Sequence, residues 1–167
     1  MRTIAYILIL GALLLVQTTI SNFIWIYGVK PDLPLVFALC MAMVKGEKAG
    51  ALTGFLNGFL EDILFGRFLG LNAIVKSITG YIVGYGSRDL YKGRVIITMA
   101  LTFIGSVIFN FLFMILAFLT GEVGHPWYRF LLIVIPSALL NMIISPLIYL
   151  GVIKLERFFD YYFDIKY

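Results

Sequence analysis

The sequence has few of the residues on which most enzymes and disulfide-stabilised proteins depend. Among 167 residues there are one cysteine, one histidine and only 13% charged residues. The single Cys40 excludes an internal disulfide and a multi-cysteine metal site. His125 lies in a Gly-Pro loop and has no second histidine with which to form a catalytic dyad. The sequence also lacks a GxxxxGK[ST] nucleotide-binding loop. We therefore predict no catalytic residue, no metal site and no cofactor.

Apolar residues, by contrast, are abundant. They make up 62% of the chain, and the mean hydropathy is +1.01. Soluble domains have about 45–50% apolar and about 25% charged residues. The composition thus predicts an integral membrane protein, and the absence of a Ser-, Gly- or Pro-rich linker predicts one transmembrane domain over residues 1–167. The net charge is +4, but the basic residues are scattered among short loops, which argues against nucleic-acid binding.

Charged breaks divide the chain into six apolar runs, which predict an all-α bundle of six transmembrane helices. The runs cover residues 4–26, 33–44, 49–64, 69–85, 95–119 and 130–153. The second and third runs are shorter than the ~20 residues that a perpendicular span needs. They could be partial spans, tilted helices or a hairpin packed inside the bundle. An arrangement with five crossings also stays open.

The basic residues predict the orientation of this bundle. With six crossings and a cytoplasmic N-terminus, nine of the thirteen Lys and Arg residues face the cytoplasm. These nine are Arg2, Lys45, Lys48, Arg88, Lys92, Arg94, Lys154, Arg157 and Lys166. Three face outward, namely Lys30, Arg67 and Arg129, and Lys76 lies within a span. Both termini are therefore expected in the cytoplasm.

Glycines recur every four residues along two neighbouring helices. Residues four apart share one helix face, and glycines on that face let another helix backbone approach closely. The first ladder is Gly50, Gly54 and Gly58, and the second contains Gly80 and Gly84. We predict that the two faces pack together, either for stability alone or as part of a functional site.

Lys76 is an ionisable residue inside a predicted span. A charge at the bilayer centre costs about 2.5–3.5 kcal/mol on insertion scales, so it needs a partner or water. Asp62 continues the first glycine ladder and is the first candidate for an intramembrane ion pair with Lys76. Glu61 points about 100° away from Asp62, and its partner stays open.

Polar side chains concentrate in the half of the bundle that is predicted to face outward. The residues of this polar outer-half cluster are Gln17, Asn22, Asn72, Asn110 and Asn141. The cluster could line a pocket open to the outside. Alternatively, these side chains could satisfy one another as hydrogen bonds between helices, worth roughly 0.6–2 kcal/mol per contact.

The stretch KPDLPLVFALCMAMVKGEKAGALTGFLNGFLEDILFGRFLGLNAIVKSITGYIVG, residues 30–84, resembles the rod shape-determining MreD family. The resemblance is carried by Pro31-Asp32-Leu33, by the Gly50, Gly54, Gly58 and Asp62 series, and by Leu69-Gly70-Leu71 leading to Ala73. It implies a non-catalytic, multi-pass scaffold of the bacterial cytoplasmic membrane that serves cell-wall elongation. The implied partners are MreC, RodA, a class B penicillin-binding protein and, indirectly, MreB.

The MreD family is also similar in fold to the substrate-binding subunits of energy-coupling factor vitamin transporters, which have six helices and an outward-facing pocket. This similarity makes a substrate-binding membrane subunit of a small-molecule transporter the alternative function. Such subunits often dock their membrane partner through an alanine ladder on the first helix. Here Ala5 and Ala12 are seven residues apart, which favours the scaffold.

Overall fold

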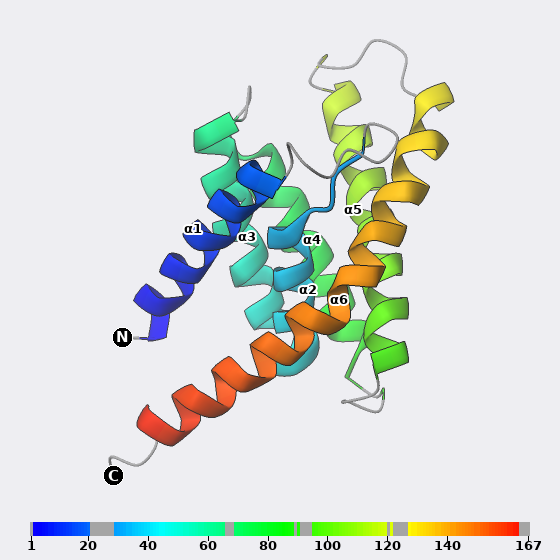
Figure 1. Cartoon of the computed structure of the whole chain (residues 1–167). Coiled ribbons are helices and arrows are strands. Elements are labelled where there is room, and N and C mark those ends of the chain that lie inside the picture. Colours follow the sequence, from blue (N-terminus) through cyan, green and yellow to red (C-terminus); the bar gives the residue numbers. More distant parts are fainter. Residues whose placement is uncertain are drawn as a thin grey trace.

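The computed structural model describes residues 2–20, 29–65, 69–88, 90, 95–119, 121 and 127–163. Within these residues the chain forms six α-helices, so the predicted all-α fold with six helices is confirmed. The helices are α1 (Arg2–Ile20), α2 (Leu33–Lys45), α3 (Glu47–Phe65), α4 (Leu71–Gly86), α5 (Val95–Leu119) and α6 (Trp127–Phe163). Figure 1 shows them as one bundle, with α1 on one flank and α5 and α6 on the other.

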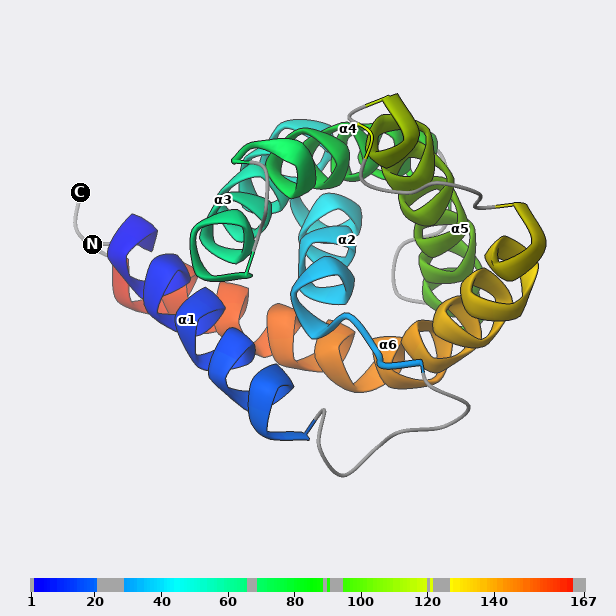
Figure 2. The same cartoon turned by 90° about the horizontal axis from the view of Figure 1, so that it is seen from above.

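Helix α2 lies at the centre of the bundle, enclosed by the other helices when the molecule is seen from above (Figure 2). Every residue from Leu33 to Met43 is buried, as expected for a helix that is apolar on all sides. Its 13 residues are fewer than the ~20 of a perpendicular span. One residue, Gly46, joins α2 to α3, and its φ of 95° is a conformation that glycine adopts readily. Helices α2 and α3 are therefore a hairpin, with α2 packed inside the bundle.

The start of α2 is fixed by its own sequence. The Asp32 side chain accepts a hydrogen bond of 2.9 Å from the backbone N–H of Leu35, which caps the helix N-terminus. Pro34 lies in the first turn, where its missing N–H has no cost. A side-chain amide from elsewhere in the bundle secures the same turn, because Asn57 Nδ2 donates to the carbonyl oxygen of Pro34 at 2.5 Å.

Helices α3 and α4 touch through their backbones. A Cβ atom built at Gly54 would overlap the backbone carbonyl of Lys76, and one at Gly80 would overlap the carbonyl of Gly50. Gly58 faces the backbone of Asn72 and Ala73, and Gly84 faces that of Glu47. The structure thus places all five predicted helix-packing glycines at this contact, where only hydrogen fits as a side chain.

Helices α5 and α6 are the long elements of the fold. The segments Val95–Leu119 and Leu132–Tyr161 are long and apolar enough to cross a membrane, by length and composition. Helix α6 has 37 residues and contains Pro136 and Pro146. Its C-terminal part turns away from the bundle and passes toward the N-terminal end of α1 (Figure 1). Proline removes a helix hydrogen bond and crowds the preceding turn, which explains a bend within a continuous helix.

Polar contacts gather at the end of the bundle where α2 meets α3. Lys45 Nζ lies 2.5 Å from a carboxylate oxygen of Glu156 and donates to Tyr6 Oη at 3.0 Å. Arg88 Nε donates to Glu47 at 3.0 Å, and this hydrogen bond holds the pKa of the Glu47 carboxyl below its ordinary value. These contacts bring the N-terminal part of α1 and the C-terminal part of α6 to the end of the bundle where the turn between α2 and α3 lies (Figure 1).

Candidate functional site: a buried ionic cluster

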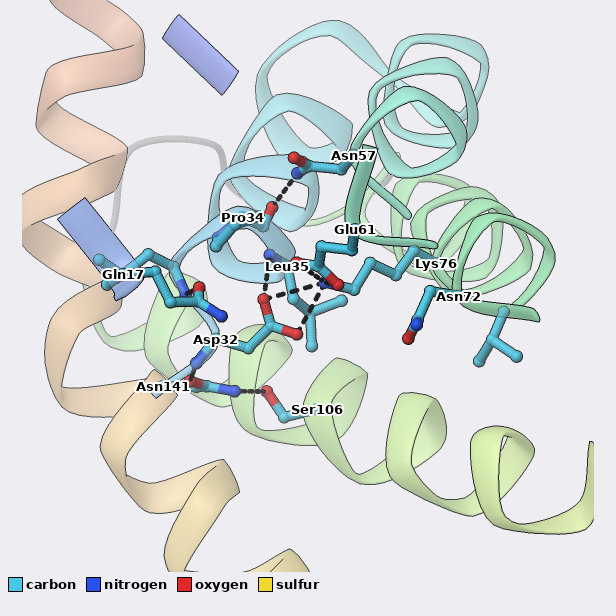
Figure 3. Close-up of polar contacts among 12 residues, drawn as sticks. Gln17, Asp32, Pro34, Leu35, Asn57, Glu61, Asn72, Lys76, Ser106 and Asn141 are labelled. Carbon is cyan, nitrogen blue, oxygen red and sulfur yellow. Dashed lines mark hydrogen bonds and ion pairs between the residues drawn. The ribbon is translucent and has the colours of Figure 1, made fainter. Parts of the chain in front are cut away.

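The side chain of Lys76 is completely buried and binds two carboxylates. Its Nζ atom lies 2.7 Å from each carboxylate oxygen of Glu61 and 2.8 Å from Oδ2 of Asp32. The ring of Phe109 lies on another side, with its centroid 5.4 Å from Nζ, within the range of a cation–π contact. Three helices and the loop before α2 therefore meet at one ammonium group. Figure 3 shows this ionic cluster of Asp32, Glu61 and Lys76.

Asp32 is held in place from several sides. Its backbone N–H donates to Asn141 Oδ1 at 2.8 Å, and Asn141 Nδ2 donates to Ser106 Oγ at 3.0 Å. The next backbone N–H, that of Leu33, donates to Gln17 Oε1 at 3.0 Å. Helices α1, α5 and α6 thus all contribute to fixing the loop that presents the Asp32 carboxylate (Figure 3).

The structure corrects the predicted ion pair between Asp62 and Lys76. The Asp62 carboxylate instead accepts backbone hydrogen bonds from Gly70 at 2.9 Å, Asn72 at 3.2 Å and Ala73 at 3.1 Å. It also accepts from Asn72 Nδ2 at 2.8 Å. The first N–H groups of a helix have no partner within the helix, and a carboxylate there satisfies them and interacts favourably with the helix dipole. Asp62 therefore caps α4, and Lys76 pairs with Glu61 and Asp32.

The predicted polar outer-half cluster divides into separate contacts. Gln17 and Asn141 meet around the start of α2, whereas Asn72 bonds to Asp62. Asn110 donates to the carbonyl oxygen of Ser106 on its own helix at 2.7 Å. Asn22 and His125 lie outside the described residues. Of the members with a described structure, Gln17 and Asn72 line one cavity, whereas Asn110 and Asn141 do not line it.

A polar cavity of about 370 Å³ adjoins the ionic cluster. Glu61 contributes to its wall together with Gln17, Lys30 and Asn72. Such a volume lies within the roughly 300–1,000 Å³ of small-molecule sites. Glu61 therefore connects the buried Lys76 with an accessible space beside α1.

The ionic cluster has a consequence for stability. Two carboxylates around one ammonium leave a formal excess of one negative charge in a buried place. Removing one partner of a buried ion pair costs about 3–5 kcal/mol, because the remaining charge stays buried without compensation. No group of three or more His, Cys, Asp or Glu side chains in the described part of the chain could hold a metal ion. Cys40 is buried, with its Sγ atom 3.9 Å from the carbonyl oxygen of Ser145.

Sequence reasoning found Lys76 and its need for an acid but missed Asp32 as a site residue. The available signal was an aspartate directly before Leu33-Pro34, a pattern typical of a helix N-terminus. That signal locates Asp32 at the start of α2 but does not show that α2 packs against α4. The pairing depends on the position of α2 inside the bundle, which residue spacing alone does not reveal.

In the part of the chain that the structure describes, six helices, two of them long and apolar enough to cross a membrane, and a buried ionic cluster are the features of a small α-helical membrane protein. The family model of rod shape-determining protein MreD matches residues 1–159 of the 167-residue chain. The chain therefore belongs to the MreD family, whose role is rod-shape determination and which is not a known family of enzymes. No curated protein matches the chain, and no solved structure does.

Proposed function

We propose that this protein is a non-catalytic scaffold of the rod-shape machinery, spanning the bacterial cytoplasmic membrane several times with both termini in the cytoplasm. MreC is the first expected partner. RodA and a class B penicillin-binding protein are further partners, and MreB is linked indirectly. Membership of the MreD family supplies the cellular process, and the interior of the bundle supports the mechanical role.

The observation that carries this proposal is the rigid interior of the bundle. Helix α2 is buried on all sides, Lys76 links it to α3 through Asp32 and Glu61, and glycines join α3 to α4. Interiors so closely connected transmit strain and do not yield easily. A protein that aligns other membrane proteins needs such a fixed frame.

The exterior supports the same proposal. Helix α6 carries large apolar side chains that are strongly exposed, including Leu132, Ile143 and Leu147. In a membrane these side chains contact either lipid or the spans of partner proteins. A rigid interior with an extended apolar exterior suits a platform onto which partner helices pack.

The distribution of basic residues supports the proposed orientation. Lys45 and Lys48 flank the turn between α2 and α3, and Arg88 follows α4. In Figure 1 the N-terminal end of α1 and the C-terminal end of α6 lie toward the same end of the bundle as that turn. Excess Lys and Arg in short loops marks the cytoplasmic side, so this end is proposed to face the cytoplasm.

The polar cavity beside Glu61 favours a second candidate function, a substrate-binding membrane subunit of a small-molecule transporter. Its volume of about 370 Å³ and its mixed lining with Gln17, Lys30 and Asn72 suit a small polar ligand. In that case the subunit would work with a second membrane protein that couples it to ATPases.

Purification in a mild detergent from native membranes, followed by mass spectrometry of the bound proteins, distinguishes the two functions. An unrelated tagged membrane protein of similar size serves as the control. The scaffold predicts recovery of MreC together with RodA or the penicillin-binding protein, all absent from the control. Recovery of a membrane coupler with ATPases, and of no elongation protein, would instead support the transporter subunit.

A further inference from the structure

A second, larger cavity lies between α1 and α3. Its volume is about 750 Å³, and among the described residues that line it Thr18 alone is polar. Leu8 and Leu15 line it from α1, and Leu60 and Leu64 line it from α3. Gly11 also lines it, and a Cβ atom built there would meet no atom within 4 Å. The cavity is thus an apolar groove with open space above a glycine, which we call the α1/α3 groove.

The α1/α3 groove continues into the polar cavity beside Glu61. Leu14, Thr18 and Phe65 line both of them. Lys30 and Glu61, a cation and an anion, occur only in the polar part. The joined space therefore has an apolar section along two helices and a charged section at one end. This is the shape and polarity of an amphiphile, with a hydrocarbon chain on one side and a charged head on the other.

The charges in the polar section indicate the kind of head group. Asp32 and Glu61 share the single ammonium group of Lys76, so the Glu61 carboxylate can accept hydrogen bonds from a further cation. An ionised carboxylate offers about four lone-pair positions, and Lys76 does not use them all. Lys30, on the wall of the same cavity, suits an anionic oxygen. A head group with both an ammonium and a phosphate complements this pair.

We propose that the α1/α3 groove and its polar extension bind one zwitterionic phospholipid. One of its two acyl chains lies between α1 and α3, its phosphate lies near Lys30, and its primary ammonium group donates hydrogen bonds to Glu61. This binding is separate from the scaffold function, since it needs no protein partner. The lipid would fill the space that the side chains of α1 leave open, and its ammonium group would offset the excess negative charge of the ionic cluster.

Native mass spectrometry of the detergent-purified protein tests this proposal directly. The probes are phosphatidylethanolamine and phosphatidylglycerol with identical acyl chains, supplied in equal amounts. We expect the wild-type protein to retain one phosphatidylethanolamine about tenfold more than phosphatidylglycerol, because hydrogen bonds to charged groups are stronger than those between neutral groups. Equal retention of both lipids, as for lipid that only surrounds the protein, would overturn the proposal.

Two variants separate the chain site from the head-group site. Gly11→Phe fills the groove and should abolish most lipid retention, whereas Gly151→Phe is the matched control, because Gly151 also has no atom within 4 Å of a built Cβ and does not line the groove. Glu61→Gln should lower the retention of phosphatidylethanolamine to that of phosphatidylglycerol and so remove the preference. Equal retention in Gly11→Phe and Gly151→Phe, or an unchanged preference in Glu61→Gln, would contradict the proposal.

A variant at Glu61 could fail to fold, because Glu61 binds Lys76. The wild-type protein provides the same test with phosphatidylcholine, whose quaternary ammonium has no N–H group to donate. We expect weaker retention of phosphatidylcholine than of phosphatidylethanolamine. Equal retention of these two lipids would show that Glu61 does not recognise the ammonium by hydrogen bonding.

Discussion

Helix α3 contacts two neighbours in opposite ways. Against α4 it packs backbone to backbone, with glycines on both sides and no room for a methyl group. Against α1 it leaves a groove of about 750 Å³ lined by large apolar side chains. Small residues allow close approach in membranes, where lipid supplies no hydrophobic force to press helices together. The comparison teaches that the spacing of glycines decides which contact of α3 is rigid and which one has space for another molecule.

The largest expected effect is on folding, when a glycine is replaced by leucine at the α3–α4 contact. The same replacement in the α1/α3 groove is the comparison. Gly54→Leu should abolish folding, because its Cβ atom would overlap the backbone of Lys76. Gly11→Leu should leave folding unchanged, because its Cβ atom has open space. The folded yield after size-exclusion chromatography in detergent measures both. A monodisperse Gly54→Leu protein with wild-type yield would show that the α3–α4 contact is not as close as described.

The second largest effect is expected at Lys76, the positive charge of the ionic cluster. Lys76→Met leaves two buried carboxylates without their partner and should destabilise the protein by about 3–5 kcal/mol. Chemical unfolding in detergent measures the change. Lys48→Met is the matched control, since Lys48 is exposed, and it should have little effect. Adding Asp32→Asn and Glu61→Gln to Lys76→Met should recover much of the loss, because no charge then remains uncompensated.

A smaller effect is expected at the cap of α4. Asp62→Leu removes the acceptor for the first N–H groups of that helix and should destabilise the protein by about 2 kcal/mol. Because Asp62 does not bind Lys76, the double variant with Lys76→Leu should be less stable than either single variant. Recovery of stability in the double variant, seen in the same unfolding experiment, would restore the pairing of Asp62 with Lys76.

The smallest effect is expected at the pair formed by Glu47 and the exposed Arg88. The hydrogen bond from Arg88 lowers the pKa of Glu47, so its stabilising contribution is present above the ordinary carboxyl pKa and disappears as the pH falls through the lowered value. Arg88→Gln should therefore be slightly less stable than wild type at neutral pH and equal to it in acid. Thermal unfolding midpoints of both proteins between neutral and acidic pH measure this. A difference that grows in acid would contradict the assignment.

Much of the close contact between α3 and α4, and the need of Lys76 for an acidic partner, could be predicted from the sequence. Steps of four residues placed Gly50, Gly54 and Gly58 on one face and Gly80 and Gly84 on another, because helical periodicity alone fixes which residues share a face. The need of Lys76 for an acid followed from the cost of a buried charge. Both inferences use only local geometry and elementary electrostatics, which the residue types determine.

The choice of acid could not be predicted in the same way. Asp62 shares a face with the glycines, yet the turn at Gly70, with φ of 102°, brings the N–H groups of α4 to its carboxylate. Glu61 starts about 100° away around the helix, but its longer side chain reaches Lys76. Asp32 comes from a loop whose position depends on Gln17 and Asn141. Loop conformation and long-range packing decided the pairing, and neither is encoded in periodicity.

The groove beside α1 was also outside the reach of sequence reasoning. Leu8, Leu15 and Leu64 are large apolar residues, which suggest close packing in a sequence as readily as they line a cavity. Only the separation of α1 from α3 shows that space remains between them. A cavity is a property of the distance between elements, whereas residue patterns indicate only which faces turn toward each other.

The most direct test of the central claim, that Lys76 organises the interior through Glu61 and Asp32, is a pair of double-mutant cycles measured by chemical unfolding. One cycle combines Lys76→Met with Glu61→Gln and the other combines Lys76→Met with Asp62→Asn. The structure predicts a coupling of about 1.5 kcal/mol or more for Lys76 with Glu61 and a clearly smaller one for Lys76 with Asp62. A larger coupling of Lys76 with Asp62 than with Glu61 would contradict the described cluster.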